Sequence, residues 1–171
     1  MYHKIILTAL CLLLSSHLQS AIYLKPTPQF KPRREIAALY IEHGDLILLL
    51  HRHANKSQGN KWGIPGGKVD KNETPLEAVI REVFEETGYD VSKQPIETLD
   101  TVYVEHTATD HIVYHMFRTK LQGDPAAVKI NFHEHKGFTW DTPADALKLD
   151  LIQDEDPCIK LVYFPDTASK S

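Results

Sequence analysis

The chain has 171 residues, of which 42% are hydrophobic and 25% are charged, and its formal net charge is −4. This length suits one domain with a sizeable core, and the composition is ordinary for a soluble globular protein. Because the net charge is slightly negative, no global basic field draws the chain to a nucleic-acid polymer or to an acidic membrane surface. The two cysteines, Cys11 and Cys158, lack zinc-ligand spacing.

The N-terminal residues 1–21 have the pattern of an export signal. A lysine precedes the apolar run IILTALCLLL, and the polar segment SSHLQSA follows it. A basic start, a short apolar core and a polar exit are typical of a secretory signal, and the run is too short to span a bilayer. We therefore expect a periplasmic or secreted protein. The alternative is an apolar extension of a cytoplasmic one, since large residues stand where a cleavage site needs small ones.

Residues 22–34 contain the proline-rich, basic segment KPTPQFKPRR, which predicts an extended linker. The runs EIAALYIE and LILLLHR follow, separated around Gly44, and predict two strands. Residues 46–50 are continuously apolar, so the second strand is expected to be covered on both faces. The folded domain is predicted to occupy residues 35–171.

The best-marked helix in the sequence lies between Thr74 and Gly88. Thr74 is a good N-cap, Pro75 occupies the first helical position, and Glu77 completes a capping box. Gly88 permits the left-handed conformation that ends many helices. The residues expected on its core side are Leu76, Val79, Ile80, Val83, Phe84 and Thr87.

The second half of the chain mixes strands and helices. ETLDTVYVEHT and HIVYHMFRTKL, separated by ATD, predict a hairpin, and GFTW predicts a short strand. Two further helices are expected, one capped by Thr142 and one starting at Asp156. Strands alternating with well-capped helices predict a layered α/β domain with a mixed sheet.

The end of the first helix carries an unfavourable concentration of negative charge. At about 100° per residue, Glu82, Glu85 and Glu86 fall within an arc of about 100°, which we expect to face away from the core. Carboxylates in the last turn oppose the helix dipole, at roughly 0.3–1 kcal/mol each. Arg81 can offset part of this repulsion by pairing with Glu77 or Glu85. A solvated helix face is one explanation, and a site for a hard divalent cation such as Mg²⁺ is the other.

The segment before this helix favours the cation site. PGG, at residues 65–67, lets the backbone approach a ligand closely. From Gly67 to Tyr89 the sequence GKVDKNETPLEAVIREVFEETGY resembles the signature of the Nudix hydrolase family. Every glycine and charged position of that signature is filled, and the aromatic Tyr89 replaces the usual aliphatic residue.

The resemblance implies an α/β/α sandwich with a mixed β-sheet. It also implies hydrolysis of a phosphoanhydride bond in a nucleoside diphosphate linked to another group, and leaves open nucleoside triphosphates, diadenosine polyphosphates and sugar nucleotides. A small nucleotide is the expected partner and Mg²⁺ the expected cofactor, with Mn²⁺ as a substitute. The alternative is a non-catalytic nucleotide-binding module on the same fold. We expect a monomer or homodimer, with no nucleic-acid polymer and no stable membrane span.

The resemblance also assigns roles to residues of the motif. The metal ligands that it implies are Gly67, through its carbonyl, Glu82, Glu85 and Glu86. Arg81 is expected to orient and neutralise the carboxylates, and with Glu82 and Glu85 it belongs to the predicted catalytic set. Glu73 and Gly88 are expected to be structural.

Candidates outside the motif complete the predicted site. Glu134 is placed like a downstream acid that serves some relatives as general base, and a solvated loop acid is the alternative. Arg52 could bind a substrate phosphate or form a surface ion pair. Gly66 is expected to approach the substrate through its backbone. Trp62 beside the glycine segment could stack on a base, as could Tyr103 and Tyr114, although aromatic residues in strands more often belong to the core.

Overall fold

The computed structural model describes residues 20–107 and 109–165. Its strands are β1 (Ala21–Tyr23), β2 (Arg34–His43), β3 (Leu46–Arg52), β4 (Trp62–Gly63), β5 (Gly66–Lys68), β6 (Ile96–Thr107), β7 (Asp110–Lys120) and β8 (His135–Asp141). Its helices are α1 (Pro75–Thr87), the short 3₁₀ helix η1 (Pro125–Ala127), α2 (Pro143–Ala146) and α3 (Glu155–Tyr163). The predicted strands and helices are therefore present, with shifts of a few residues at their ends.

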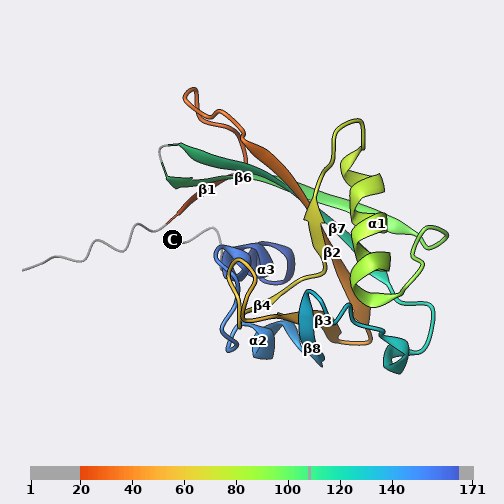
Figure 1. Cartoon of the computed structure of the whole chain (residues 1–171). Coiled ribbons are helices and arrows are strands. Elements are labelled where there is room, and N and C mark those ends of the chain that lie inside the picture. Colours follow the sequence, from red (N-terminus) through yellow and green to blue (C-terminus); the bar gives the residue numbers. More distant parts are fainter. Residues whose placement is uncertain (1–19, 108, 166–171) are drawn as a thin grey trace, which may run out of the picture.

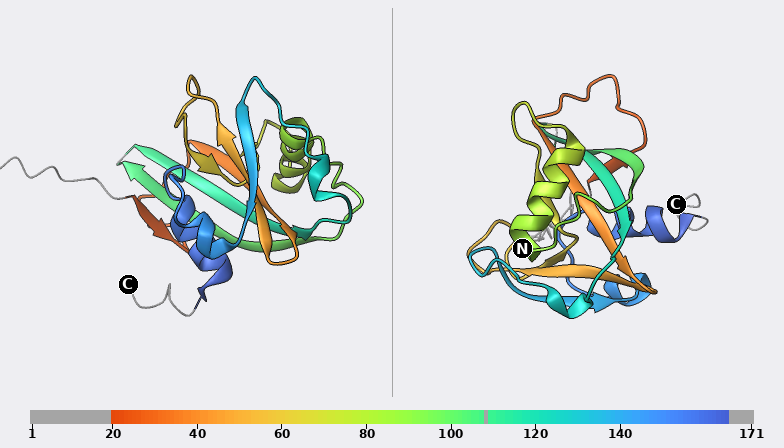
Figure 2. Two further views of the ribbon diagram at one scale, coloured as in Figure 1. Left: turned by 90° about the horizontal axis from the view of Figure 1, so that it is seen from below. Right: turned by 90° about the vertical axis from the view of Figure 1, so that its right-hand side faces the viewer.

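All eight strands form one mixed sheet in the order β1-β6-β7-β2-β3-β4, with β5 paired to β2 and β8 paired to β3. β2 runs parallel to β7, whereas its pairing with β3 and β5 is antiparallel. Helix α1 lies on one side of the sheet and α3 on the other (Figures 1 and 2). This confirms the predicted α/β/α sandwich.

Each face of the sheet has its own hydrophobic core, because successive side chains of a strand point to opposite faces. On β3, Leu48 and Leu50 pack with Val79 and Val83 of α1. Leu49 lies in the other cluster, which includes Ile159 of α3. The prediction that this continuously apolar strand is covered on both faces is confirmed.

A gap between β2 and β3 is filled by the glycine segment. The two strands pair next to their connecting turn, through Glu42–Ile47 and His43–Leu46. Farther along, β5 pairs with the first part of β2 and β4 pairs with the end of β3. The carbonyl of Pro65 accepts a hydrogen bond from the amide of Leu39 (2.9 Å). The segment between β4 and β5 is thereby held in the sheet, where β5 contacts α1.

The ends of α1 are as predicted. The Thr74 hydroxyl accepts a hydrogen bond from the Glu77 amide, and the Glu77 carboxylate accepts one from the Thr74 amide, which completes the capping box. Gly88 ends the helix with φ of 74°, and its amide donates to the carbonyl of Phe84. These short-range contacts follow directly from the sequence.

The buried face of α1 differs from the expectation. Leu76 and Phe84, expected in the core, are 41% and 56% exposed, whereas Glu86, expected to face solvent, is 4% exposed. The reason is that α1 packs against both β2 and β5, so its buried stripe is rotated toward Glu86. The expectation that the glutamates all face away from the core is therefore wrong for Glu86.

The segment predicted as a linker, residues 22–34, contacts the sheet in the structure. β1 pairs antiparallel with β6 at the edge of the sheet. The ring of Phe30 stacks on His111, with 5.0 Å between ring centroids, and the Thr27 hydroxyl donates a hydrogen bond to Glu105 (2.7 Å). The segment is therefore not detached from the domain, because these side chains find partners on the β6–β7 hairpin.

Residues 1–19 of the predicted export signal lie outside the described residues, and the signal stays a prediction. Within residues 20–107 and 109–165, no helix is long and apolar enough to cross a membrane.

Candidate active site

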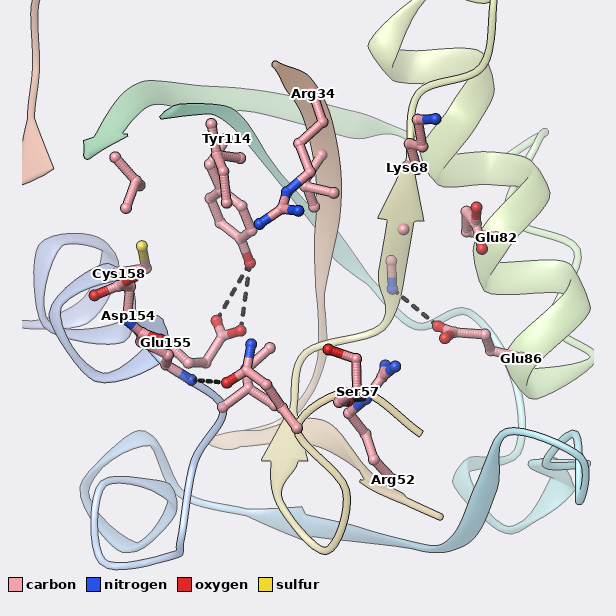
Figure 3. A pocket seen from close by; sticks show the side chains of 18 of the residues that line it. Arg34, Arg52, Ser57, Lys68, Glu82, Glu86, Tyr114, Asp154, Glu155 and Cys158 are labelled. Atoms are coloured by element: carbon pink, nitrogen blue, oxygen red, sulfur yellow. Dashed lines mark hydrogen bonds between the residues drawn. The ribbon is translucent and has the colours of Figure 1, made fainter. Parts of the chain in front are cut away.

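A pocket of about 530 Å³ lies between α1 and the N-terminus of α3. Figure 3 shows Glu82 and Glu86 of α1 on one side of it, and Tyr114 of β7 and Glu155 of α3 on the other. Glu85 and Glu134 also line the pocket, as do three basic residues: Arg34, Arg52 and Lys68. Acidic and basic side chains therefore share one cavity.

Glu86 is buried and hydrogen-bonded inside the protein. Its carboxylate accepts a hydrogen bond from the amide of Gly66 (2.9 Å), and its other oxygen lies 3.6 Å from Nε2 of His135. Burial, reinforced by repulsion from Glu82 and Glu134, raises the pKa of Glu86 to about 8. At neutral pH this side chain is therefore largely protonated, and a cation at the site would favour its ionised form.

His135 packs against Glu86 as a neutral ring. It is 2% exposed, and burial together with the charges of Arg52 and Lys56 lowers its pKa to about 4. Its Nδ1 is buried and has no hydrogen-bond partner among the described residues. A neutral imidazole can donate from Nε2 toward the carboxyl of Glu86, which leaves Nδ1 as an acceptor.

Gly67 and Glu82 are in close contact. A Cβ atom placed on Gly67 would lie 2.3 Å from the carboxyl carbon of Glu82, so a larger residue would displace that carboxylate. Burial raises the pKa of Glu82, and its hydrogen bond from Arg81 opposes this shift. At Gly66, with φ of 151°, a Cβ would meet the Ala37 carbonyl oxygen at 2.2 Å. Gly66 is therefore required by the close approach of the β2 backbone, and a side chain at Gly67 would push the Glu82 carboxylate aside. The approach of these glycines to a ligand stays a prediction.

Arg81 ties the carboxylates of the motif together. Its guanidinium donates two hydrogen bonds to Glu73 (both 2.9 Å) and one to Glu82 (2.8 Å), and it lies 3.5 Å from Glu85. Hydrogen bonding to Glu73 raises the already high pKa of Arg81 and lowers that of Glu73. The expected pairing with Glu85 is present. Glu77 instead serves the capping box, so pairing with that residue is not observed.

Arg52 is the last residue of β3 and Glu134 directly precedes β8, and both line the pocket. The carbonyl of Glu134 accepts a hydrogen bond from the His53 amide (2.8 Å), which links the two segments. The carboxylate of Glu134 is about half-exposed and lies 3.9 Å from Lys56. Arg52 donates to the carbonyl of Ser57 and forms no ion pair among the described residues. Its charge is therefore free to meet an anion in the pocket.

Comparisons with known proteins agree with this arrangement. The family model described as the NUDIX domain matches residues 31–162. The chain belongs to the Nudix family. A CTP pyrophosphohydrolase of Escherichia coli (strain K12) is 28% identical over 128 residues, covering 74% of this chain and 88% of that protein.

Two further relatives agree with this assignment. An 8-oxo-dGTP diphosphatase of Proteus vulgaris is 41% identical over 56 residues, which cover 33% of this chain and 48% of that protein, so the match spans about half of its length. The crystal structure of the MutT protein from Methanosarcina mazei Go1 has a TM-score of 0.65 and 26% identity, and covers 82% of this chain and 98% of that one. The Nudix fold and hydrolase class predicted from the motif are confirmed.

Trp62 does not line the Nudix pocket. Its ring stacks on His51, with 4.2 Å between ring centroids, and packs against the core on the α3 side of the sheet. The prediction that Trp62 stacks on a base therefore finds no support in this geometry. Tyr114 does line the pocket, whereas Tyr103 packs edge-on against Phe30.

The pocket also contains residues that the sequence did not single out. Glu155 is 2% exposed, and burial raises its pKa to about 7. The hydroxyls of Tyr40 and Tyr114 lie 3.3 and 3.4 Å from its carboxyl oxygens. Lys68 directly follows Gly67 of the motif, and this position could have indicated from the sequence that Lys68 lines the pocket. The sequence offered no comparable signal for Glu155, because the segment DEDP is typical of the acidic start of a helix.

The Nudix pocket fits a divalent cation through its oxygen donors. Glu82, Glu85 and Glu86 line the same cavity as Gly67. The pKa values of Glu82 and Glu86 are raised, so a nearby positive charge would stabilise the ionised form of each carboxyl. No group of three acidic, histidine or cysteine side chains in the described part of the chain forms a ready-made metal cage. Mg²⁺ needs no such cage, because it keeps waters and binds through one or two carboxylates and substrate phosphates.

Proposed function

We propose that the protein is a Mg²⁺-dependent pyrophosphohydrolase that cleaves a nucleoside triphosphate and releases the nucleoside monophosphate. The observation that carries this proposal is the meeting of α1 carboxylates and basic side chains in one pocket. A triphosphate would be repelled by carboxylates alone, and it would be bound without hydrolysis by basic residues alone. The names of the CTP and 8-oxo-dGTP relatives support a triphosphate as the substrate class.

The α1 side of the pocket is suited to the phosphates and the cation. Gly67 through its carbonyl, with Glu82, Glu85 and Glu86, would hold Mg²⁺. When bound, Mg²⁺ supplies positive charge that neutralises phosphate oxygens and acidifies water. Arg81 keeps Glu82 in place through the hydrogen bond of 2.8 Å.

The roles of the remaining residues follow from their positions. Glu134 is half-exposed on the rim and is free to accept a proton from the attacking water. Arg52 and Lys68 would contact phosphate oxygens and orient the chain of phosphates. The nucleoside would extend toward Tyr114 and Glu155, at the opposite end of the cavity.

The test uses purified protein, Mg²⁺ and a panel of nucleoside triphosphates, diadenosine polyphosphates and sugar nucleotides. We expect turnover of at least one triphosphate, with nucleoside monophosphate and pyrophosphate as products, and loss of turnover in EDTA. Glu85→Gln is the informative variant, because its side chain is 54% exposed and the fold does not depend on it. Turnover of sugar nucleotides alone would overturn the substrate class. Nucleotide binding without turnover of any compound would favour the non-catalytic module.

A further inference from the structure

The backbone of Asp154, directly before α3, is in a strained conformation. Its φ and ψ are 69° and 4°, in the left-handed region that residues other than glycine rarely adopt. It occupies the N-cap position of α3, yet its side chain makes no capping hydrogen bond. Aspartate is favoured at N-caps because it makes that bond. Another contact must therefore hold this residue in place.

That contact is His106 on β6. Nε2 of His106 lies at hydrogen-bonding distance from the carboxylate of Asp154, and Nδ1 lies 3.3 Å from the carboxylate of Asp110. Asp110 in turn is 3.0 Å from the guanidinium of Arg34. The side chains of His106 and Asp154 are 14% and 15% exposed, and both line the pocket. A polar chain therefore links α3 to strands β6, β7 and β2 beside the cavity.

The residue that follows Asp154 is Glu155, whose carboxyl lies inside the pocket (Figure 3). The left-handed turn at Asp154 sets the direction in which the chain enters α3, and so sets where Glu155 lies. Its neighbours Tyr114 and Tyr40 hold it through long hydrogen bonds of 3.3–3.4 Å. The backbone of Ile64 donates a further hydrogen bond to the same carboxyl. The contact between His106 and Asp154 acts instead on the backbone that carries this side chain, at the residue directly before Glu155.

We propose that His106 is a positioning residue: by holding Asp154 in its left-handed conformation, it places the carboxyl of Glu155 where that group selects the base of the nucleotide. A carboxyl group recognises a base edge through N–H donors, and it discriminates only if its oxygens are fixed. This proposal rests on the proposed function, since it assumes that a nucleoside occupies this end of the pocket. Neither His106 nor Asp154 would touch the reacting phosphates.

The experiment compares His106→Gln and Asp154→Ala with the wild type. Asp154→Ala removes the contact and disfavours the left-handed conformation, so it remains informative if His106→Gln folds poorly. His115→Gln is the matched control, because His115 also contacts a carboxylate, that of Glu35 (2.9 Å), but does not line the pocket. kcat and KM are measured for CTP, GTP, ATP and UTP, and thermal unfolding monitors the fold.

We expect both pocket variants to raise KM for the preferred base about tenfold and to reduce the spread of kcat/KM between bases, with kcat for the poorest base changed less than twofold. A uniform fall in kcat for all four bases, or an unchanged preference, would overturn the proposal. His115→Gln is expected to keep the wild-type preference.

If the wild type hydrolyses no triphosphate, the proposed function fails, and calorimetric binding of the four nucleoside monophosphates decides the inference separately. Base-selective binding that is lost in Asp154→Ala would support the positioning role. Binding that is equal in the wild type and the variant would overturn it.

Discussion

Replacing the buried Glu86 by glutamine is expected to stabilise the metal-free protein, increasingly so as pH rises. The pKa of Glu86 is raised from 4.5 to about 8, and at about 1.4 kcal/mol per pKa unit this difference amounts to roughly 5 kcal/mol. The folded state keeps a proton that the unfolded state releases above pH 4.5. The free energy of unfolding therefore falls as pH rises from about 4.5 to about 8, and is level above that range.

Between pH 5.5 and pH 8.5, the contribution of Glu86 to this loss is about 3 kcal/mol. Glu86→Gln removes that contribution and keeps an acceptor for the amide of Gly66. The assay is urea unfolding in EDTA at several pH values across this range. Glu85→Gln is the matched control, since the same change is made one residue away on a side chain that is 54% exposed.

Other groups, such as Glu155, titrate equally in the wild type, Glu86→Gln and Glu85→Gln. The difference between their pH profiles therefore isolates the contribution of Glu86 to the free energy of unfolding. We expect the stability difference between Glu86→Gln and the wild type to grow by a few kcal/mol with pH, and that for Glu85→Gln to stay nearly constant. Parallel pH profiles for the wild type and Glu86→Gln would refute the reasoning, because they would show that Glu86 carries no cost of buried charge. Added Mg²⁺ should then stabilise the wild type more than Glu86→Gln at pH 8.5.

Three further predictions concern the pocket. Gly67→Ala is expected to lower kcat at least about tenfold and to weaken Mn²⁺ binding measured by electron paramagnetic resonance, because its Cβ would displace Glu82. Gly123→Ala is the control and should have no effect, because a Cβ at that position would meet no atom within 4 Å. Glu134→Gln is expected to lower kcat by about 10²-fold or more with little change in KM, and a loss below threefold would remove it as general base. Because the pKa of Glu155 is about 7, raising the pH from 6 to 8 ionises it. The ionised carboxylate should favour GTP, whose base edge presents two neighbouring N–H donors, over CTP, whose base edge presents a donor beside an acceptor, so the ratio of kcat/KM for GTP to that for CTP should rise. A ratio that does not change with pH, or one that still changes with pH in Glu155→Gln, would contradict this role.

The parts of the site that depend on local sequence could be predicted. The capping box of Thr74, the helix end at Gly88 and the clustering of the α1 glutamates involve contacts within a few residues. The spacing of the motif also led to the family, which the family model confirms over residues 31–162. In each case the interaction that fixes the structure lies within one helix and the segment next to it.

The opposite end of the pocket could not be predicted in this way. Tyr114 of β7 was only one of several aromatic candidates, and His106 of β6 and Glu155 of α3 were not predicted at all. They meet because the sheet order places β7 beside β2 and lets α3 close the same cavity. Helical periodicity likewise placed Glu86 in solvent, because it describes the helix without its neighbours. Only the pairing of β5 with β2 shows that Gly66 lies beneath that side chain.

The burial of Glu86 also changes the interpretation of the charge on α1. The sequence predicts repulsion between Glu82 and Glu86, four residues apart, and opposition to the helix dipole. In the metal-free protein at neutral pH, Glu86 is largely protonated and Glu82 is paired with Arg81, so most of that repulsion is absent. The repulsion returns when Glu86 ionises, and a cation in the pocket is what would make ionisation favourable. The helix is thus stable without metal because its most buried carboxyl is neutral. Under the proposed function, the same carboxyl lies beside the glycine segment and would become a metal ligand on losing its proton.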